Sequence, residues 1–147
     1  MSGDLAFKET IRPPLWLIAF VATLLFSLVV AIWAALDTRA AGYSAIASLL
    51  LLIYFYLSNI HRITFDGQEL HVDRAHIEMK YIGEITVLTQ KEFLLARTRE
   101  LDPAAFPALI YWVSRGVRLE VIDDRDRTPY WLISTKRGEE LKRTLCK

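Results

Sequence analysis

Residues 15–36 read LWLIAFVATLLFSLVVAIWAAL and residues 40–60 read AAGYSAIASLLLLIYFYLSNI, and these two stretches decide the fold. Neither contains a charged residue, and each is long enough as a helix to cross the roughly 30 Å hydrocarbon core of a bilayer. They must be helical, because lipid offers no hydrogen-bond partner to an unpaired backbone group. The connection around Asp37 is short, so the sequence predicts an antiparallel transmembrane hairpin.

The first stretch can also be compared with a cleaved signal peptide. Its apolar run is longer than the roughly 7–15 residues of a signal-peptide core, and a second span follows at once. Trp16 and Trp33 lie near its two ends, where tryptophan favours the membrane interfaces. We therefore expect both helices to be retained.

The basic residues that flank the two stretches predict their orientation. Lys8 and Arg12 precede the first helix and Arg62 and Arg74 follow the second, whereas Arg39 is alone in the connection. Loops rich in lysine and arginine stay on the cytoplasmic side of a membrane. We therefore expect a multi-pass protein of the cell (plasma) membrane with both termini in the cytoplasm.

Small residues recur at every fourth position of the first helix, and such spacing lets helix backbones approach closely in lipid. The predicted helix-packing face consists of Ala19, Thr23, Ser27, Ala31 and Ala35. This face could pack against the second helix of the same hairpin, against a second copy of the chain, or against another membrane protein. The sequence leaves these alternatives open.

From residue 61 onward the pattern changes from continuously apolar to alternating. The pair Asp66-Gly67 between two alternating runs predicts a β-hairpin, because these residues tolerate the positive φ of a tight turn. Strands are predicted at residues 61–65, 69–73, 76–80, 82–88, 108–113, 117–122 and 130–134, and helices at 90–101 and 138–146.

The predicted organisation has three parts and belongs to the α+β class. Residues 1–14 form a cytoplasmic N-terminal segment, and residues 15–60 form the transmembrane hairpin, with helices 15–36 and 40–60. Residues 61–147 form a cytoplasmic, mostly antiparallel β domain with a C-terminal helix.

The composition excludes several function classes. The 18 Lys and Arg residues and the 17 Asp and Glu residues leave a formal net charge of +1, too little to indicate a nucleic-acid binder. The six glycines are never clustered, as a phosphate-binding loop, a dinucleotide fingerprint or a nucleophile elbow requires. A single cysteine cannot form a thiolate metal site. We therefore expect no catalytic, cofactor-binding or metal-binding residues, and a protein that is not an enzyme.

Two polar clusters contain residue types that can bind a metal ion. Asp123, Asp124 and Asp126 could hold a metal with a phosphorylated ligand, but aspartate is also common in solvated turns, which we favour here. His71 and His76 lie on adjacent predicted strands and would need a third ligand that the sequence does not supply.

Aromatic and basic residues near the end of the chain indicate a contact surface, because one residue of each aromatic pair on a strand should be exposed. The predicted contact surface consists of Arg118, Tyr130, Trp131, Lys136 and Arg137. Some of these residues also belong to a possible basic face toward anionic lipid headgroups. That face consists of Arg97, Arg99, Arg115, Arg118, Lys136 and Arg137. Nearby acidic residues largely offset its charge.

The stretch TPYWLIST at residues 128–135, preceded by VRLEV at 117–121 and followed by EEL at 139–141, resembles a known family. It is the actinobacterial membrane-protein family catalogued as domain of unknown function 3093. Residues 82–85, IGEI, and the two apolar spans also fit, so the resemblance covers nearly the whole chain. Gly138 stands where the family pattern has proline. The family has no assigned activity, so the resemblance implies an architecture without a chemistry.

A looser similarity connects the last strand and helix to the end of bacterial pleckstrin-homology-like domains. The leading hypothesis is a non-catalytic, membrane-anchored interaction or scaffold module on the cytoplasmic face. The alternative is an accessory subunit of a membrane enzyme or transporter. The expected partners are the lipid bilayer, anionic lipid headgroups, and a membrane protein or a second copy of the chain, but no nucleic acid.

Overall fold

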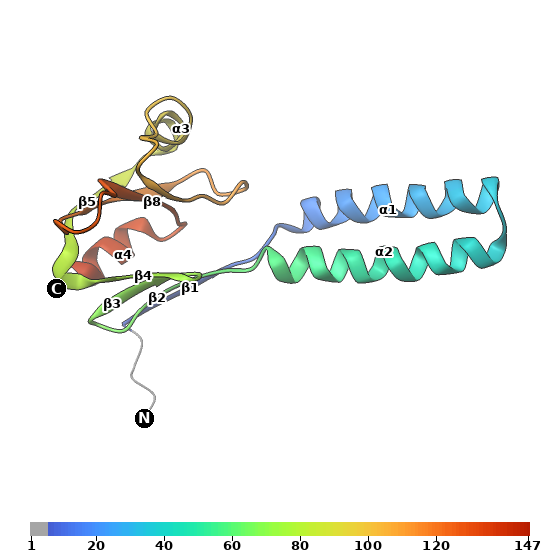
Figure 1. Ribbon diagram of the computed structural model, residues 1–147, viewed down its shortest axis with the longest axis horizontal. Helices are drawn as coiled ribbons and strands as arrows, with labels where there is room; N and C mark the ends of the chain where they lie inside the picture. Colours follow the sequence, from blue (N-terminus) through green and yellow to red (C-terminus); the bar gives the residue numbers. More distant parts are fainter. Residues whose placement is uncertain (1–5) are drawn as a thin grey trace. The chain divides into compact units, whose positions relative to one another are not determined.

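In the computed structural model, which describes residues 6–147, the chain divides into two units (Figure 1). One unit is the helical hairpin, residues 12–60. The other joins the strand that precedes the hairpin to residues 61–147. The sequence therefore places the hairpin inside the β domain rather than before it.

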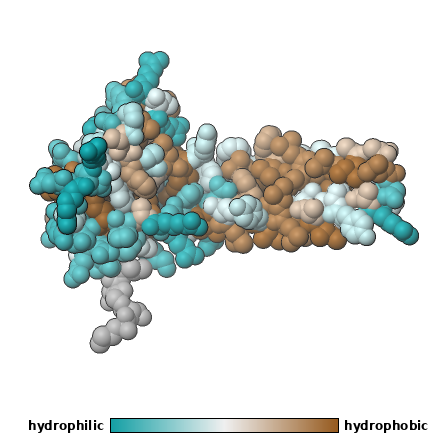
Figure 2. Space-filling view, viewed as in Figure 1, coloured by the Kyte–Doolittle hydropathy of each residue, from teal (hydrophilic) through white to brown (hydrophobic). Residues whose placement is uncertain are grey.

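The hairpin consists of α1 (Leu15–Ala35) and α2 (Thr38–Ser58), each 21 residues long. Asp37 caps the start of α2, because its Oδ1 accepts a hydrogen bond of 2.7 Å from the backbone N–H of Ala40. Both helices are long and apolar enough to cross a membrane. Within these two helices no side chain is buried, and apolar side chains dominate their surface in Figure 2.

The first sheet has the strand order β1 (Phe7–Ile11), β2 (His61–Phe65), β3 (Glu69–Val72) and β4 (Ala75–Glu78), and all its strands are antiparallel. Strand β1 was not predicted from the sequence, which treated residues 1–14 as a separate segment. Its side chains alternate between buried and exposed, and its last residue pairs with the first residue of β2. Residues 7–11 of the predicted N-terminal segment are thus part of the β domain's first sheet.

Two tight turns connect the strands of this sheet. Gly67 has a φ of +97°, and the Asp66 carboxylate accepts hydrogen bonds from the backbone N–H groups two and three positions later, those of Gln68 and Glu69. The turn predicted at Asp66-Gly67 is therefore confirmed. The other turn contains Asp73, with a φ of 54°, a value that aspartate tolerates better than most residues.

The second sheet has the order β5 (Ile82–Leu88), β7 (Gly116–Val121), β8 (Tyr130–Ser134) and β6 (Phe106–Ala108). β6 runs parallel to β8, and the other neighbours are antiparallel. The strand predicted at 108–113 is wrong, because β6 ends at Ala108 and the chain then turns at Tyr111 and Trp112.

Three helical segments complete the domain, and the core lies between the two sheets. A short 3-10 helix, η1 (Met79–Tyr81), links the sheets, α3 (Gln90–Thr98) is shorter than the predicted helix 90–101, and α4 (Gly138–Leu145) ends the fold. In Figure 1, α4 lies between the two sheets and α3 lies on the opposite side of the second sheet. The predicted α+β class is confirmed.

Candidate functional site

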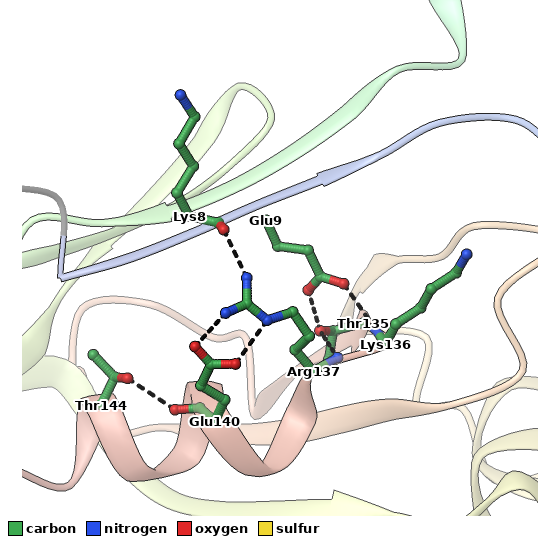
Figure 3. Close-up of polar contacts among 7 residues, drawn as sticks. All are labelled: Lys8, Glu9, Thr135, Lys136, Arg137, Glu140 and Thr144. Carbon is green, nitrogen blue, oxygen red and sulfur yellow. Dashed lines mark hydrogen bonds and ion pairs between the residues drawn. The ribbon is translucent and has the colours of Figure 1, made fainter.

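A buried carboxylate connects the first strand to the start of the last helix. Glu9 on β1 is 6% exposed, and it is the one charged side chain that is buried among the residues the structure describes. One carboxylate oxygen accepts a hydrogen bond from the Thr135 hydroxyl, and the other accepts one of 3.0 Å from the backbone N–H of Lys136 (Figure 3). Because burying a charge is costly without such partners, these bonds fix the β8–α4 turn against β1.

Arg137 is held within the same network. Its Nε donates a hydrogen bond of 2.7 Å to Glu140, a second guanidinium nitrogen also pairs with that carboxylate, and Nη1 donates one of 3.0 Å to the Lys8 carbonyl oxygen. The hydrogen bonds to Glu140 raise the pKa of Arg137. The guanidinium lies over the Phe7 ring at 5.1 Å. Arg137 therefore stabilises the fold, and its side chain is already engaged.

The structure corrects the predicted contact surface at its aromatic members. Tyr130 and Trp131 are each 6% exposed, because β8 is a central strand that is covered on both faces. Tyr130 packs with the α3 residue Phe93, whereas Trp131 points into the core between the sheets. Arg118 is exposed, and its guanidinium lies 4.0 Å from the centre of the Tyr130 ring.

The structure brings together two cations of the predicted basic face, Arg115 and Lys136. The first precedes β7 and the second follows β8, and these strands are antiparallel neighbours with Gly116 opposite Ser134. Both side chains are exposed, and neither forms an ion pair within residues 6–147. Figure 3 shows the Lys136 ammonium pointing away from the Glu9 network.

Arg115 and Lys136 line two shallow pockets. One, of about 240 Å³, also includes the acidic side chains Glu139 and Glu140 at the start of α4. The other, of about 230 Å³, has no acidic residue in its lining. We call this second pocket the Arg115 pocket, and its lining residues are Trp112, Val113, Ser114, Arg115 and Lys136.

Trp112, which lines the Arg115 pocket, carries an unsatisfied hydrogen-bond donor. Its indole Nε1 is buried and has no hydrogen-bond partner among the described residues. Its ring lies 6.2 Å from the imidazole of His61, whose Nδ1 is 2.6 Å from an Asp73 carboxylate oxygen. The neighbouring Tyr111 is 95% exposed. Sequence reasoning did not join Trp112 to the two cations.

In the acidic turn at residues 123–128, two carboxylates accept hydrogen bonds from backbone N–H groups of the turn itself. Asp123 accepts a hydrogen bond of 3.0 Å from the N–H of Arg125, and Asp126 accepts one of 2.9 Å from the N–H of Thr128. The bond from Thr128 lowers the pKa of Asp126. This geometry supports the interpretation of a solvated turn over that of a metal site.

The two histidines predicted on adjacent strands are neighbours. His71 and His76 pair across β3 and β4, with ring centres 5.8 Å apart. Across residues 6–147, no three His, Cys, Asp or Glu side chains are arranged to hold a metal ion.

The small-residue face of α1 points away from α2. The half-buried side chains of α1, which mark its contact with α2, are mostly large and recur every three or four residues, as Leu25, Val29 and Ile32 do. In α2 the corresponding half-buried positions include the small residues Ser44 and Ser48. All five residues of the predicted packing face are exposed: Ala19, Thr23, Ser27, Ala31 and Ala35. The alternative in which this face packs against the second helix of the same hairpin is therefore wrong.

These features define a class of protein: an α+β domain whose first two strands are separated along the chain by an apolar helical hairpin. The family model described as "Protein of unknown function (DUF3093)" matches residues 6–145, and the chain belongs to this family. No curated protein and no solved structure matches the chain. The similarity to pleckstrin-homology-like domains is not confirmed and stays a prediction from the sequence.

Proposed function

We propose that this protein is a non-catalytic, membrane-anchored interaction module. The observation that carries the proposal is the pairing of β1 with β2, the strands on either side of the hairpin, with Ile11 opposite His61. Because both ends of the hairpin continue into one sheet, both must emerge on the same side of a membrane. Two spanning helices satisfy this requirement, and a single span does not.

The surface of the hairpin supports insertion into lipid. Large apolar side chains such as Leu15, Phe26 and Leu50 are 83%, 68% and 62% exposed, and they would be unfavourable in water over so large an area. The excess of basic residues beside the outer ends of the helices supports a cytoplasmic β domain.

The use of the polar side chains supports a binding role rather than catalysis. Ser134 accepts a hydrogen bond from the N–H of Ile110, and Thr135 is bonded to Glu9, so both hydroxyls serve the fold. Arg115 and Lys136, two exposed cations without an ion pair among the described residues, line one pocket and suit the binding of an anionic partner.

The orientation of the hairpin can be tested by cysteine labelling in intact cells. The native Cys146 is the only cysteine and is exposed, and Thr38 is exposed as the first residue of α2, next to the connection between the helices. We expect a membrane-impermeant maleimide to label a Thr38→Cys, Cys146→Ser variant from outside. The native chain should be labelled only after permeabilisation. Labelling of Cys146 in intact cells, or release of the protein from membranes by alkaline carbonate, would contradict the proposal.

The exposed face of α1 favours a second candidate function, that of an accessory subunit of a membrane enzyme or transporter. In lipid, small residues at this spacing allow another helix to approach closely. Because α2 packs on the other side of α1, the face formed by Ala19, Thr23, Ser27, Ala31 and Ala35 is available to a partner helix.

The accessory-subunit hypothesis predicts that Ser27 and Ala31 are needed for contact with a membrane partner. We expect Ser27→Leu with Ala31→Leu to reduce recovery of a crosslinked membrane partner at least about tenfold, since bulky side chains prevent close approach. The matched control is Ser27→Ala with Ala31→Ser, which keeps both positions small and should retain the partner. Equal recovery with both variants would count against this function.

A further inference from the structure

We infer that the Arg115 pocket binds the phosphate group of an anionic lipid headgroup. This inference rests on the proposed function, because it takes the hairpin to lie in the membrane. It adds a ligand class and a binding site to that function.

The charges of the pocket favour an anion. Arg115 and Lys136 are exposed, carry no ion pair within the described residues, and converge because β7 and β8 are paired. The adjacent pocket contains Glu139 and Glu140, whose carboxylates would repel a phosphate. The Arg115 pocket has the same two cations and no acidic residue in its lining, so that repulsion is weaker there.

The polar groups of the pocket fit a phosphate in particular. The Trp112 indole N–H is a buried donor without an acceptor, and buried donors are nearly always paired in folded proteins. Phosphate oxygens accept hydrogen bonds from both charged and neutral donors. The backbone of Lys136 is held in place by Glu9. A phosphate at this pocket would therefore meet two cations, beside Trp112, whose indole N–H has no other acceptor among the described residues.

The covalent chain indicates that the phosphate belongs to a lipid. His61 follows Ser58, the last residue of α2, by three positions, so the chain holds it within about 11 Å of the helix end. The Trp112 ring is 6.2 Å from the His61 ring. Tyr111, beside it, is 95% exposed, and such rings favour the interface between lipid and water. The headgroups of the same leaflet are thus the nearest source of phosphate.

The test uses the full chain, purified in detergent and in phosphate-free buffer, with lipid binding measured by native mass spectrometry. Titration with phosphatidylglycerol should give saturable binding, whereas phosphatidylcholine should bind much more weakly. An Arg115→Gln, Lys136→Gln variant should bind phosphatidylglycerol about 30-fold more weakly, as expected for the loss of two basic contacts. Trp112→Phe keeps the ring but lacks the donor, and it should weaken binding about fivefold.

The matched control is Lys91→Gln with Arg127→Gln, which also removes two exposed positive charges and should change binding less than about twofold. An equal loss in this control would show a general charge effect and overturn the site. Displacement of the lipid by millimolar inorganic phosphate would assign the pocket to free phosphate and overturn the lipid. If the Arg115→Gln, Lys136→Gln variant binds lipid as the wild type does while Thr38→Cys is still labelled from outside, the lipid site is overturned and the membrane anchor stands. If the labelling of Thr38→Cys fails as well, both the lipid site and the proposed membrane anchor are overturned.

Discussion

Replacement of Glu9 by alanine is expected to lower the free energy of unfolding of the β domain by about 3 kcal/mol, because two partners lose their acceptor. Thr135 is 1% exposed, and in the variant its hydroxyl and the Lys136 N–H would both lose the carboxylate that accepts their hydrogen bonds. Strand β1 would also lose its side-chain connection to the β8–α4 turn. Urea unfolding of the detergent-solubilised full chain, followed by tryptophan fluorescence, measures this loss.

Two variants separate the hydrogen bonds of Glu9 from the general effect of changing β1. Glu9→Gln keeps an acceptor for one partner and should cost about 1 kcal/mol. Lys8→Ala changes the exposed neighbour, whose backbone carbonyl still accepts from Arg137, and should cost less than about 0.5 kcal/mol. If Glu9→Ala is no more destabilising than Lys8→Ala, the buried network does not stabilise the domain.

Replacement of Gly116 by alanine is expected to cost about 3 kcal/mol, because the added Cβ has no room. The methyl group would lie well inside van der Waals contact of the Ile133 carbonyl oxygen and of Phe93 Cε2, and 2.7 Å from Phe93 Cδ2. Phe93 is completely buried, and the carbonyl belongs to the central strand β8, so neither can move without disturbing the core. The same urea experiment measures the loss of stability.

The control for this variant is Gly42→Ala in α2, where an added Cβ would meet nothing within 4 Å. We expect no loss of stability there, since alanine favours the helix more than glycine does. A Gly116→Ala protein as stable as the Gly42→Ala protein would mean that α3 does not pack on the second sheet as described.

The parts of the fold that the sequence predicted well are those fixed by local physics. Residues 15–60 cannot avoid forming helices if they lie in lipid, and the Asp66-Gly67 turn follows from the conformational freedom of those two residues. Strands β2, β3 and β7 show the alternation of a sheet with one covered face. None of these predictions needed knowledge of distant contacts.

The missed parts depend on partners far away in the sequence. Strand β1 has only five residues, and its pairing strand begins about 50 positions later, beyond the hairpin. Trp131 faces the core between the sheets, and the burial of Tyr130 on the other face depends on α3, which covers a face that alternation alone would leave exposed. The orientation of the α1 face depends on which side α2 occupies, and the helix's own pattern does not contain that information.

The sequence predicted some residues of the candidate site but not their arrangement. Arg115 and Lys136 were recognised as members of a basic face, but only the antiparallel pairing of β7 with β8 places them together. Arg137 was in the same predicted set, yet its pairing with Glu140 commits it to the fold. Trp112 was noticed as an aromatic residue, and the lack of an acceptor for its N–H becomes visible only in three dimensions.

The pairing of β1 with β2 across the hairpin has a consequence for how the protein is made. During synthesis β1 leaves the ribosome first and must wait for both helices before its partner strand exists. If only one helix crossed the bilayer, the two strands would end on opposite sides and the first sheet could not close. In such a chain β1 would lack its partner strand, so closure of the first sheet depends on both helices being inserted together.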